Sequence, residues 1–391
     1  MSTQPQLQKL LNTAQACLKK GDYSNALSVL TEAKASFPNS HELFFNMAVA
    51  NRLAGNLGDA IQALDEALAL EPYSFLALLS KASILEQTGQ VRRASEIYRN
   101  AISIAPTAKK LPEKLLDQLT HAQQVVNQQA IAQAGYLRDS LGSLSASEPA
   151  ENKRRFEEAI DIASGAATPF HAKALQLHYP GLPAIPFFDR VHFPWIEELE
   201  AATPLINSEL SQLTSQRQNI WAPYVQYKPG TPENQFAELN HNTNWSSIWL
   251  WKDGEKQQVA DAFPKTLDLL EKVPLAEQQN FAPTVLFSGL APRTHIPPHT
   301  GSTNTRLLVH LPMVIPGPAY FRVGNERRQW QLGTAWAFDD TIEHEAWNDC
   351  DETRVIMIFD VWNPLLSVSE VEKVGALLTL QRAWLDEERQ I

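Results

Sequence analysis

The chain has 391 residues, which predicts two or three domains, and its 44% hydrophobic and 20% charged residues are typical of a soluble globular protein. Its net charge of −11 argues against nucleic-acid and anionic-membrane partners, because both favour a basic surface. Since no run of about 18 apolar residues occurs and Cys17 and Cys350 are the only cysteines, we expect no membrane span, no disulfide framework and a cytoplasmic location.

The N-terminal part repeats with a period of 34 residues. Each unit predicts two amphipathic helices, in which small residues allow close approach, a glycine ends the first helix and a proline follows the second. The pattern resembles the tetratricopeptide repeat, with three copies in residues 1–108. Such arrays commonly bind peptides on their concave face, and an array that only dimerises or supports the next domain stays open as well. The repeated positions are Gly21, Gly55 and Gly89; Ala14, Ala48 and Ala82; Ala26, Ala60 and Ala94; Ala33, Ala67 and Ala101; and Pro38, Pro72 and Pro106.

Residues 109–164 are predicted to form a helical linker and a loop. A helical pattern of apolar and polar residues continues to residue 141 without the repeat. The serine- and alanine-rich segment 142–153 is predicted to be an exposed loop. All ten tryptophans lie at or beyond Trp195, so we expect a domain of different composition over residues 165–391.

Short apolar runs separated by Pro, Gly and Asp turns follow in that domain, and they predict an all-β sandwich or barrel. A strand-like stretch precedes them at 179–189, and flanking helices are expected at 193–213 and 369–390. The predicted strands cover 245–251, 284–289, 305–315, 334–338 and 353–362.

Three histidines, His295, His299 and His310, fall within 16 residues. On a strand through 305–311, side chains alternate between faces, so Arg306, Leu308 and His310 share one face. An arginine and a histidine on one face of an otherwise apolar strand suggest a polar cavity rather than solid core.

A fourth histidine, His344, follows a strand and a turn, and Arg354 opens the next strand. Two imidazoles from separate strands suit Fe(II), and an arginine grips a carboxylate bidentately, as an iron oxygenase that uses 2-oxoglutarate requires. The usual carboxylate ligand stands two residues after the first histidine, but after His299 that position is Gly301. The motif therefore lacks the third protein ligand of a common facial triad.

Segments 298–316 and 338–364, together with 179–190 and 193–203, resemble the aspartyl/asparaginyl β-hydroxylase family. The resemblance covers about residues 175–366. It implies a double-stranded β-helix, or jelly-roll, domain that uses Fe(II), 2-oxoglutarate and O2, and that does without the carboxylate ligand. The fold class expected for the whole chain is thus multidomain α + β, a helical repeat solenoid followed by this domain and its flanking helices.

Carried over by motif, His299 and His344 are implied as the catalytic iron ligands. Ser288 and Arg354 match the residues that grip the distal carboxylate of 2-oxoglutarate, and His310 matches a histidine near its 1-carboxylate.

One position departs from the family pattern. Members related to its best-studied enzyme carry an arginine two residues before the histidine matched by His310, and here that residue is Leu308. Arg306 faces the same way and is predicted to take over the charge in cosubstrate binding. A leucine at this place would receive an acidic substrate poorly, which leaves the substrate open.

Other candidate residues are predicted to be structural. His295 lies beside two prolines and is expected in a turn. Asp340 is expected to cap the turn before His344, with orientation of a metal-bound water as the alternative. We expect Trp245, Trp249 and Trp251 to lie in the core.

The function expected from these observations is hydroxylation of the β-carbon of an Asp- or Asn-type side chain in a peptide or protein, with 2-oxoglutarate converted to succinate. The repeats would guide the peptide to the site. Alternatives are a hydroxylase of a small molecule or lipid headgroup, a halogenase that places chloride where the carboxylate is missing, and a non-enzymatic adaptor. The oligomeric state is open.

Overall fold

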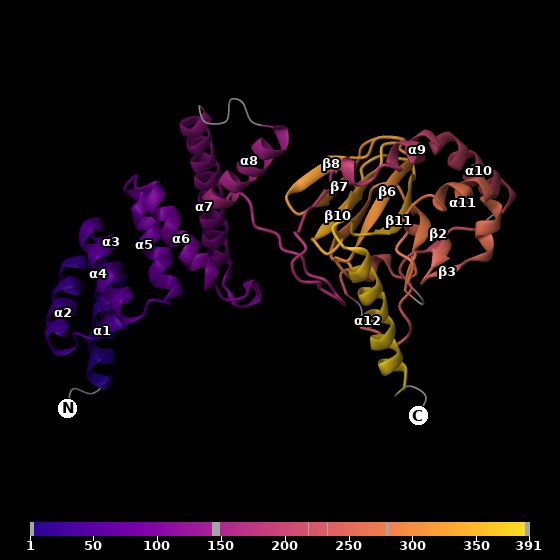
Figure 1. Cartoon of the computed structure of the whole chain (residues 1–391). Helices are drawn as coiled ribbons and strands as arrows, with labels where there is room; N and C mark the ends of the chain where they lie inside the picture. The colour runs from indigo at the N-terminus through magenta and orange to yellow at the C-terminus, as the bar shows by residue number, and fades with distance from the viewer. Residues whose placement is uncertain (1–3, 143–148, 218, 233, 279–280, 388–391) are drawn as a thin grey trace. The chain divides into compact units, whose positions relative to one another are not determined.

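The structure, a computed structural model, describes residues 4–142, 149–217, 219–232, 234–278 and 281–387. It divides into two compact units, residues Met1–Thr168 and Pro169–Ile391 (Figure 1). The first unit is helical in its described residues, and the second is rich in β-strands. This confirms the predicted order of a helical repeat region followed by a β-rich domain.

Successive helices of the first unit pack against each other as hairpins, and each 34-residue repeat contributes two helices. The nine repeated alanines are all buried, none more than 2% exposed, which explains why only a small residue recurs there. Gly21, Gly55 and Gly89 follow the first helix of each pair with φ between +76° and +84°, a conformation that glycine adopts without strain. The helices are α1 (Gln4–Lys19), α2 (Tyr23–Ser36), α3 (His41–Leu53), α4 (Leu57–Leu70), α5 (Phe75–Gln87), α6 (Val91–Ser103), α7 (Glu113–Leu141) and α8 (Ala150–Ser164).

The segment predicted as a helical linker packs into this unit. Ala122 and Val125 of α7 share a hydrophobic cluster with Ala82 of α5 and Tyr98 of α6. The predicted loop 142–153 is too long, because α8 already begins at residue 150; residues 143–148 lie outside the described ones.

Two antiparallel sheets build the second unit. One has the strand order β1-β2-β4-β11-β6-β9, with β3 paired to β2, and the other has the order β5-β10-β7-β8. All five predicted strands are confirmed, as β2, β4, β6, β9 and β11. The strands are β1 (Ala222–Pro223), β2 (Trp245–Lys252), β3 (Glu255–Lys256), β4 (Val285–Leu290), β5 (Thr294–His299), β6 (Arg306–Val314), β7 (Ala319–Val323), β8 (Glu326–Gln329), β9 (Trp336–Phe338), β10 (His344–Asn348) and β11 (Arg354–Trp362).

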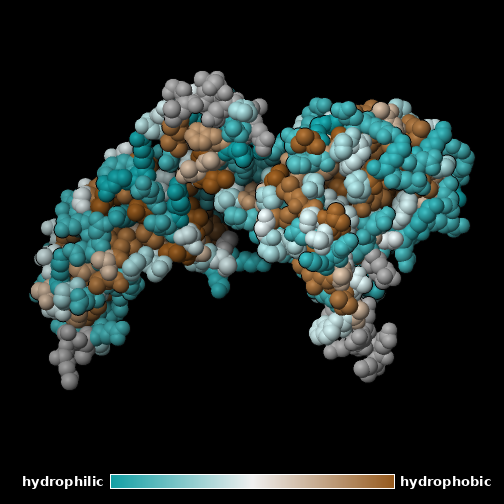
Figure 2. Space-filling model, viewed as in Figure 1, coloured by the Kyte–Doolittle hydropathy of each residue, from teal (hydrophilic) through white to brown (hydrophobic). Residues whose placement is uncertain are grey.

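The larger sheet has one face against helices and the other against the smaller sheet. Leu307, Val309 and Leu311 of β6 pack with residues of α9 (Ile196–Ala201), α10 (Thr203–Gln216) and α11 (Pro264–Leu270). Figure 2 shows that the solvent side of α10 and α11 is mostly hydrophilic. On the other face, Ile356 of β11 and Phe321 of β7 belong to one cluster that both sheets share. Polar residues of the inner face are therefore enclosed between the sheets.

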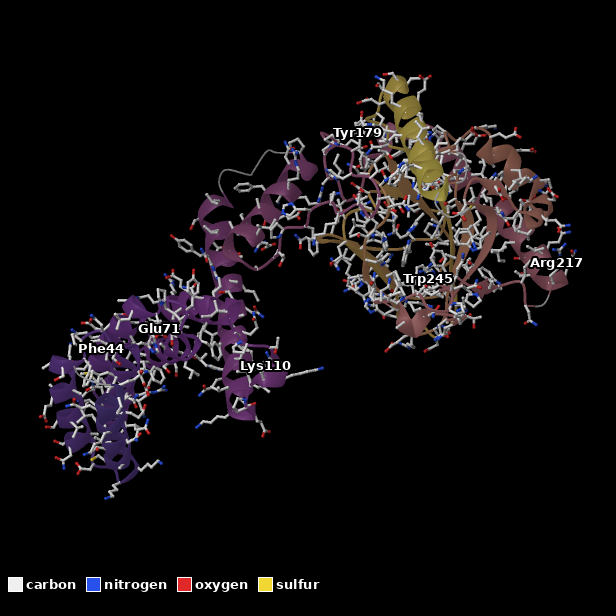
Figure 3. The ribbon with its side chains drawn as sticks, turned by 90° about the horizontal axis from the view of Figure 1, so that it is seen from below. Phe44, Glu71, Lys110, Tyr179, Arg217 and Trp245 are labelled. Carbon is white, nitrogen blue, oxygen red and sulfur yellow. The ribbon has the colours of Figure 1, made fainter. Side chains whose placement is uncertain are left out.

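The flanking segments differ in part from expectation. Residues 179–189 were predicted as strand-like but form only an isolated bridge, between Phe187 and Phe338. The helix expected over 193–213 is two helices, α9 and α10, which meet at Ala202. The C-terminal helix α12 (Val368–Glu387) is confirmed, and the hydroxyl of Tyr179 donates a hydrogen bond of 3.1 Å to Glu370 at its start (Figure 3).

Candidate active site

His299 and His344 come together at one end of the ladder between β5 and β10. His299 ends β5, His344 begins β10, and the two are direct partners in the antiparallel ladder. The register shifts between His344 and Ala346, because Pro297 and Pro298 add one residue to β5. Proline cannot donate to a ladder and is tolerated at such bulges, which redirect a side chain. The two imidazole rings lie with their centroids 4.1 Å apart.

Both rings are held in the tautomer that a metal requires. The Nδ1 atom of His299 donates to the carbonyl of Pro297 at 2.8 Å, and Nδ1 of His344 donates to the carbonyl of Ile342 at 3.0 Å. Because the protons sit on Nδ1, the Nε2 atoms keep their lone pairs. Burial lowers the pKa of both histidines, so each ring is neutral and able to bind a metal ion.

Arg354 and Ser288 lie on neighbouring strands of the larger sheet, β11 and β4. The guanidinium of Arg354 is 1% exposed, makes one long hydrogen bond of 3.4 Å to the carbonyl of Ser288, and has no partner for Nε among the described residues. Its central carbon, Cζ, lies 4.4 Å from the ring centroid of Trp330. Burial lowers its pKa to about 9. A buried cation with no carboxylate beside it is costly unless an anion binds there.

Ser288 is oriented as a donor toward the same space. Its Oγ accepts a hydrogen bond of 3.1 Å from Nε1 of Trp245, which leaves the hydroxyl proton for another acceptor. His310, on β6, is buried and its Nδ1 has no partner among the described residues. Burial, with the positive charge of Arg354, lowers the pKa of His310 well below its usual value. Serine, arginine and histidine thus offer unused donors or acceptors between the sheets.

Arg306 is engaged by an ion pair that the sequence did not indicate. Its guanidinium pairs with Asp360, which is fully buried on β11, and lies 4.3 Å over the ring of Phe281. Leu308 shares the inner face of β6 with Arg306, as alternation predicts, and is the cross-strand partner of Asp360. The structure places Arg306 in this pair, whereas no carboxylate in the described part of the chain pairs with Arg354.

Asp340 stands where a side chain at position 301 would be. A Cβ built on Gly301 would overlap the carboxylate of Asp340, so glycine at 301 makes room for that group. The turn cap expected of Asp340 is made by Asp339, whose carboxylate accepts from the amide of Thr341 at 2.9 Å and from its hydroxyl at 2.6 Å. Oδ1 of Asp340 has no partner among the described residues, and burial raises its pKa to about 7.

His295 faces the opposite side of the smaller sheet. It lies on β5 and not in a turn as predicted, its Nε2 is 2.8 Å from Oε2 of Glu345, and its ring stacks on Trp347 at 5.0 Å. These contacts give His295 a structural role on the outer surface of the sheet.

The histidine pair is the candidate metal site. Two neutral imidazoles with free Nε2 atoms are suitable iron ligands. No cluster of three or more His, Cys, Asp or Glu residues able to hold a metal occurs in the described part of the chain. The orphaned guanidinium of Arg354 adds a place for a carboxylate nearby, so the residues also fit a dicarboxylate cosubstrate.

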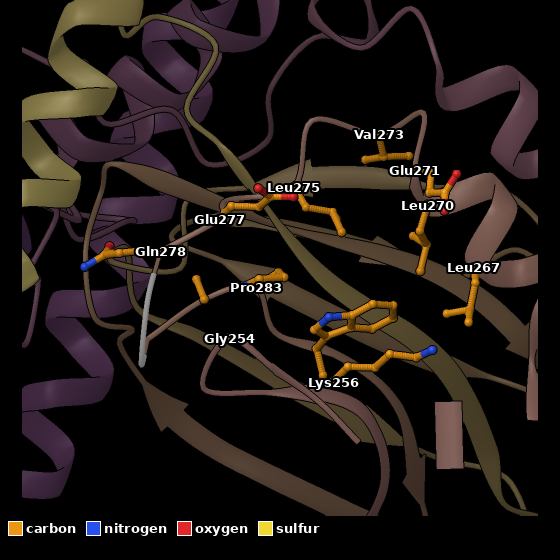
Figure 4. Close-up of a pocket in the computed structure, with 12 residues that line it drawn as sticks. Gly254, Lys256, Leu267, Leu270, Glu271, Val273, Leu275, Glu277, Gln278 and Pro283 are labelled. Atoms are coloured by element: carbon orange, nitrogen blue, oxygen red, sulfur yellow. The ribbon is translucent and has the colours of Figure 1, made fainter. Parts of the chain in front are cut away.

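A separate cavity of about 560 Å³ lies where the β2–β3 hairpin faces α11 and the loop after it (Figure 4). Its lining includes Trp251, Lys256, Leu270 and Val273, and none of the predicted site residues. Trp251 therefore borders a cavity, while Trp245 is buried in the core, as predicted.

Three aromatic residues near the site were missed as site residues by sequence reasoning. Phe236 and Trp245 lie 5.1 and 6.3 Å from the ring of His299, measured between centroids, and Trp330 covers Arg354. In the register of β2 and β4, Trp245 pairs with Leu290 and Ser247 pairs with Ser288, so the contact between Trp245 and Ser288 is a diagonal one that only this register reveals. Trp330 follows β8, where no local pattern indicates its partner.

Comparison with known proteins identifies the families that this chain resembles. The sequence profile of the aspartyl/asparaginyl beta-hydroxylase family matches residues 200–364, and that of the tetratricopeptide repeat matches residues 11–75 and 45–109. The ornithine lipid ester-linked acyl 2-hydroxylase of Rhizobium tropici is 34% identical over 200 residues, which are 50% of this chain and 67% of that protein. The aspartyl/asparaginyl beta-hydroxylase of Homo sapiens is 38% identical over 148 residues, 37% of this chain.

The chain covers only 19% of the length of that human protein. Among solved structures, the first TPR domain of the human RPAP3 protein has a TM-score of 0.27 and 18% identity, and the match covers 30% of this chain and 89% of that domain. No described helix is both long enough and apolar enough to cross a bilayer. By its matched profile and its bacterial relative, the chain belongs to the aspartyl/asparaginyl β-hydroxylase family, and it joins this hydroxylase domain to tetratricopeptide repeats.

Proposed function

We propose that this protein is an Fe(II)- and 2-oxoglutarate-dependent dioxygenase that hydroxylates a carbon atom of its substrate. One observation carries the proposal: two neutral imidazoles and a buried guanidinium lie in the same inter-sheet interior. Among the described residues, the imidazole Nε2 atoms have no partner and the guanidinium has no counter-charge. The first pair suits the metal and the second suits the distal carboxylate of the cosubstrate.

The roles follow from the metal-binding and hydrogen-bonding atoms that remain unused in each residue. His299 and His344 would hold Fe(II) through Nε2. Arg354 and the hydroxyl of Ser288 would bind the distal carboxylate, and His310 would face the other end of 2-oxoglutarate. When bound, Fe(II) and 2-oxoglutarate activate O2 so that one oxygen atom enters a C–H bond and the cosubstrate becomes succinate and CO2. The aromatic walls around the histidine pair would exclude bulk water.

Asp340 bears on the choice between hydroxylation and halogenation. A halogenase needs room for chloride where the third protein ligand is missing. Here the carboxylate of Asp340 fills the space beside Gly301, which leaves less room for chloride there. This supports hydroxylation, with Asp340 as a hydrogen-bond acceptor for a water ligand.

We propose an Asp- or Asn-type side chain of a peptide, guided by the repeats, as the first substrate class to test. A second class, the acyl part of a lipid, is favoured by Leu308 and by the pairing of Arg306 with Asp360. Together they leave the inner face of β6 without a free cation to receive a substrate carboxylate. The name of the Rhizobium tropici relative points to the same class.

The test is anaerobic binding of Fe(II) and 2-oxoglutarate, followed by succinate release on admission of O2, in wild type, His344→Ala and His295→Ala. We expect a charge-transfer absorption band and O2-dependent succinate in wild type and in His295→Ala, whose histidine faces away from the site. Both signals should be lost in His344→Ala. A wild-type protein without either signal would sink the proposal, as would a His344→Ala protein that keeps both.

A further inference from the structure

We propose that Trp330 is a positioning residue for Arg354, and that its indole holds the guanidinium ready for the distal carboxylate of 2-oxoglutarate. The inference rests on the proposed function and adds to it a residue that the motifs do not include. Trp330 would not touch the reacting atoms, and it acts through Arg354.

The contacts of Arg354 leave the indole as its main partner. The guanidinium is buried, its hydrogen bond to the carbonyl of Ser288 is long at 3.4 Å, and Nε has no partner in the described part of the chain. The indole lies 4.4 Å from the guanidinium carbon, within the range of a desolvated cation–π contact. Arginine prefers such a flat aromatic face, which leaves its in-plane donors open for a carboxylate.

Trp330 is itself fixed by its neighbours. Its side chain is 2% exposed, and its ring lies 5.4 Å from Phe321 and 6.0 Å from Trp336, nearly parallel to the latter at 16°. Its backbone amide donates to the carbonyl of Ala319, which continues the β7–β8 ladder past β8. The ring therefore has little freedom to turn, and the plane that it offers to Arg354 is set before any ligand binds.

A preorganised arginine binds a carboxylate more tightly than one that must be ordered on binding. Leucine at position 330 keeps the site apolar but removes the flat face, so the guanidinium gains orientations that do not bind the carboxylate. Phenylalanine keeps a smaller face. The effect should fall mainly on the distal carboxylate, because the Trp330 ring lies 4.4 Å from the guanidinium carbon of Arg354 but 6.1 Å from the ring of His310. The metal ligands lie on other strands, β5 and β10.

The experiment measures binding to the full chain loaded with Mn(II), by calorimetry under N2. The ligands are 2-oxoglutarate and 2-oxopentanoate, which has the same chain length but no distal carboxylate. We expect Trp330→Leu to raise the Kd of 2-oxoglutarate on the order of tenfold, with Trp330→Phe within about threefold of wild type. The Kd values of Mn(II) and 2-oxopentanoate should not change. Trp347→Leu, on the outer face of the smaller sheet, is the matched tryptophan control and should bind like wild type.

The outcomes separate this inference from the proposed function. If wild type does not bind 2-oxoglutarate, the proposed function fails and the inference fails with it. If wild type binds and Trp330→Leu binds equally well, only the role of Trp330 is refuted. A Trp330→Leu protein that loses Mn(II), 2-oxopentanoate and 2-oxoglutarate in parallel also refutes it, because a merely structural role predicts that pattern. Should Trp330→Leu fail to fold, Trp330→Phe decides. A rise of up to about threefold in the Kd of 2-oxoglutarate alone supports the inference. A Kd equal to that of wild type, or a parallel rise for 2-oxopentanoate, overturns it.

Discussion

Asp360→Asn removes the negative charge from a buried ion pair and keeps the shape of the side chain. Asp360 has no exposed side-chain surface, and its partner Arg306 is 12% exposed. One carboxylate oxygen also accepts from the amide of Thr284 at 2.8 Å, a bond that the asparagine oxygen can still make. The variant therefore leaves a buried guanidinium without its counter-charge and changes little else.

Removing one partner of such a pair costs about 3 to 5 kcal/mol of unfolding free energy. The attraction itself stabilises the fold less than this, because burial raises the pKa of Asp360 in spite of the neighbouring Arg306. Desolvation thus opposes the ionised pair, and most of the loss reflects the guanidinium left alone. It follows that the double variant Arg306→Met/Asp360→Asn, which has no buried charge at this place, should recover most of the lost stability.

Urea unfolding followed by tryptophan emission reports on the β-rich unit, residues 169–391, because all ten tryptophans lie at or beyond Trp195. Asp351→Asn, which breaks an ion pair with Arg293 on the surface, is the matched control and should change the midpoint little. The reasoning is refuted if Asp360→Asn costs no more than the control, or if the double variant is as unstable as the single one.

Three further predictions test other parts of the structure. Gly301→Ala places a methyl group into the carboxylate of Asp340, so the Kd of Fe(II), measured by anaerobic titration, should rise about tenfold or more; unchanged affinity would show that the overlap is relieved elsewhere. Arg354→Met should abolish 2-oxoglutarate binding in calorimetry, yet raise the unfolding free energy of the ligand-free protein by about 1 to 2 kcal/mol, because it removes a buried unpaired charge; a less stable variant contradicts this. Ala60→Leu overfills a fully buried repeat position and should cost about 1 to 3 kcal/mol in helix unfolding followed by circular dichroism, whereas Glu66→Leu, exposed on the same helix, should not; equal losses would argue against the close approach of the repeat helices.

Local patterns in the sequence determined most of the architecture. The 34-residue period fixed the helical hairpins, because glycine, alanine and proline each serve one steric need that recurs in every unit. Alternation and turn residues located the strands, and motif spacing selected His299, His344 and Arg354. The inferences about helices and strands succeeded because they depend on residues close together in the chain, whereas the roles of the three site residues stay predictions.

Only the tertiary structure decided which groups meet. The overlap of Asp340 with the space beside Gly301, the pairing of Arg306 with Asp360 and the cover of Arg354 by Trp330 all join residues far apart in sequence. Each depends on strand register, and a slip of one residue would turn the side chains to the other face. Register is set by packing of both sheets and by the proline bulge on β5, and no local pattern of the sequence reports these.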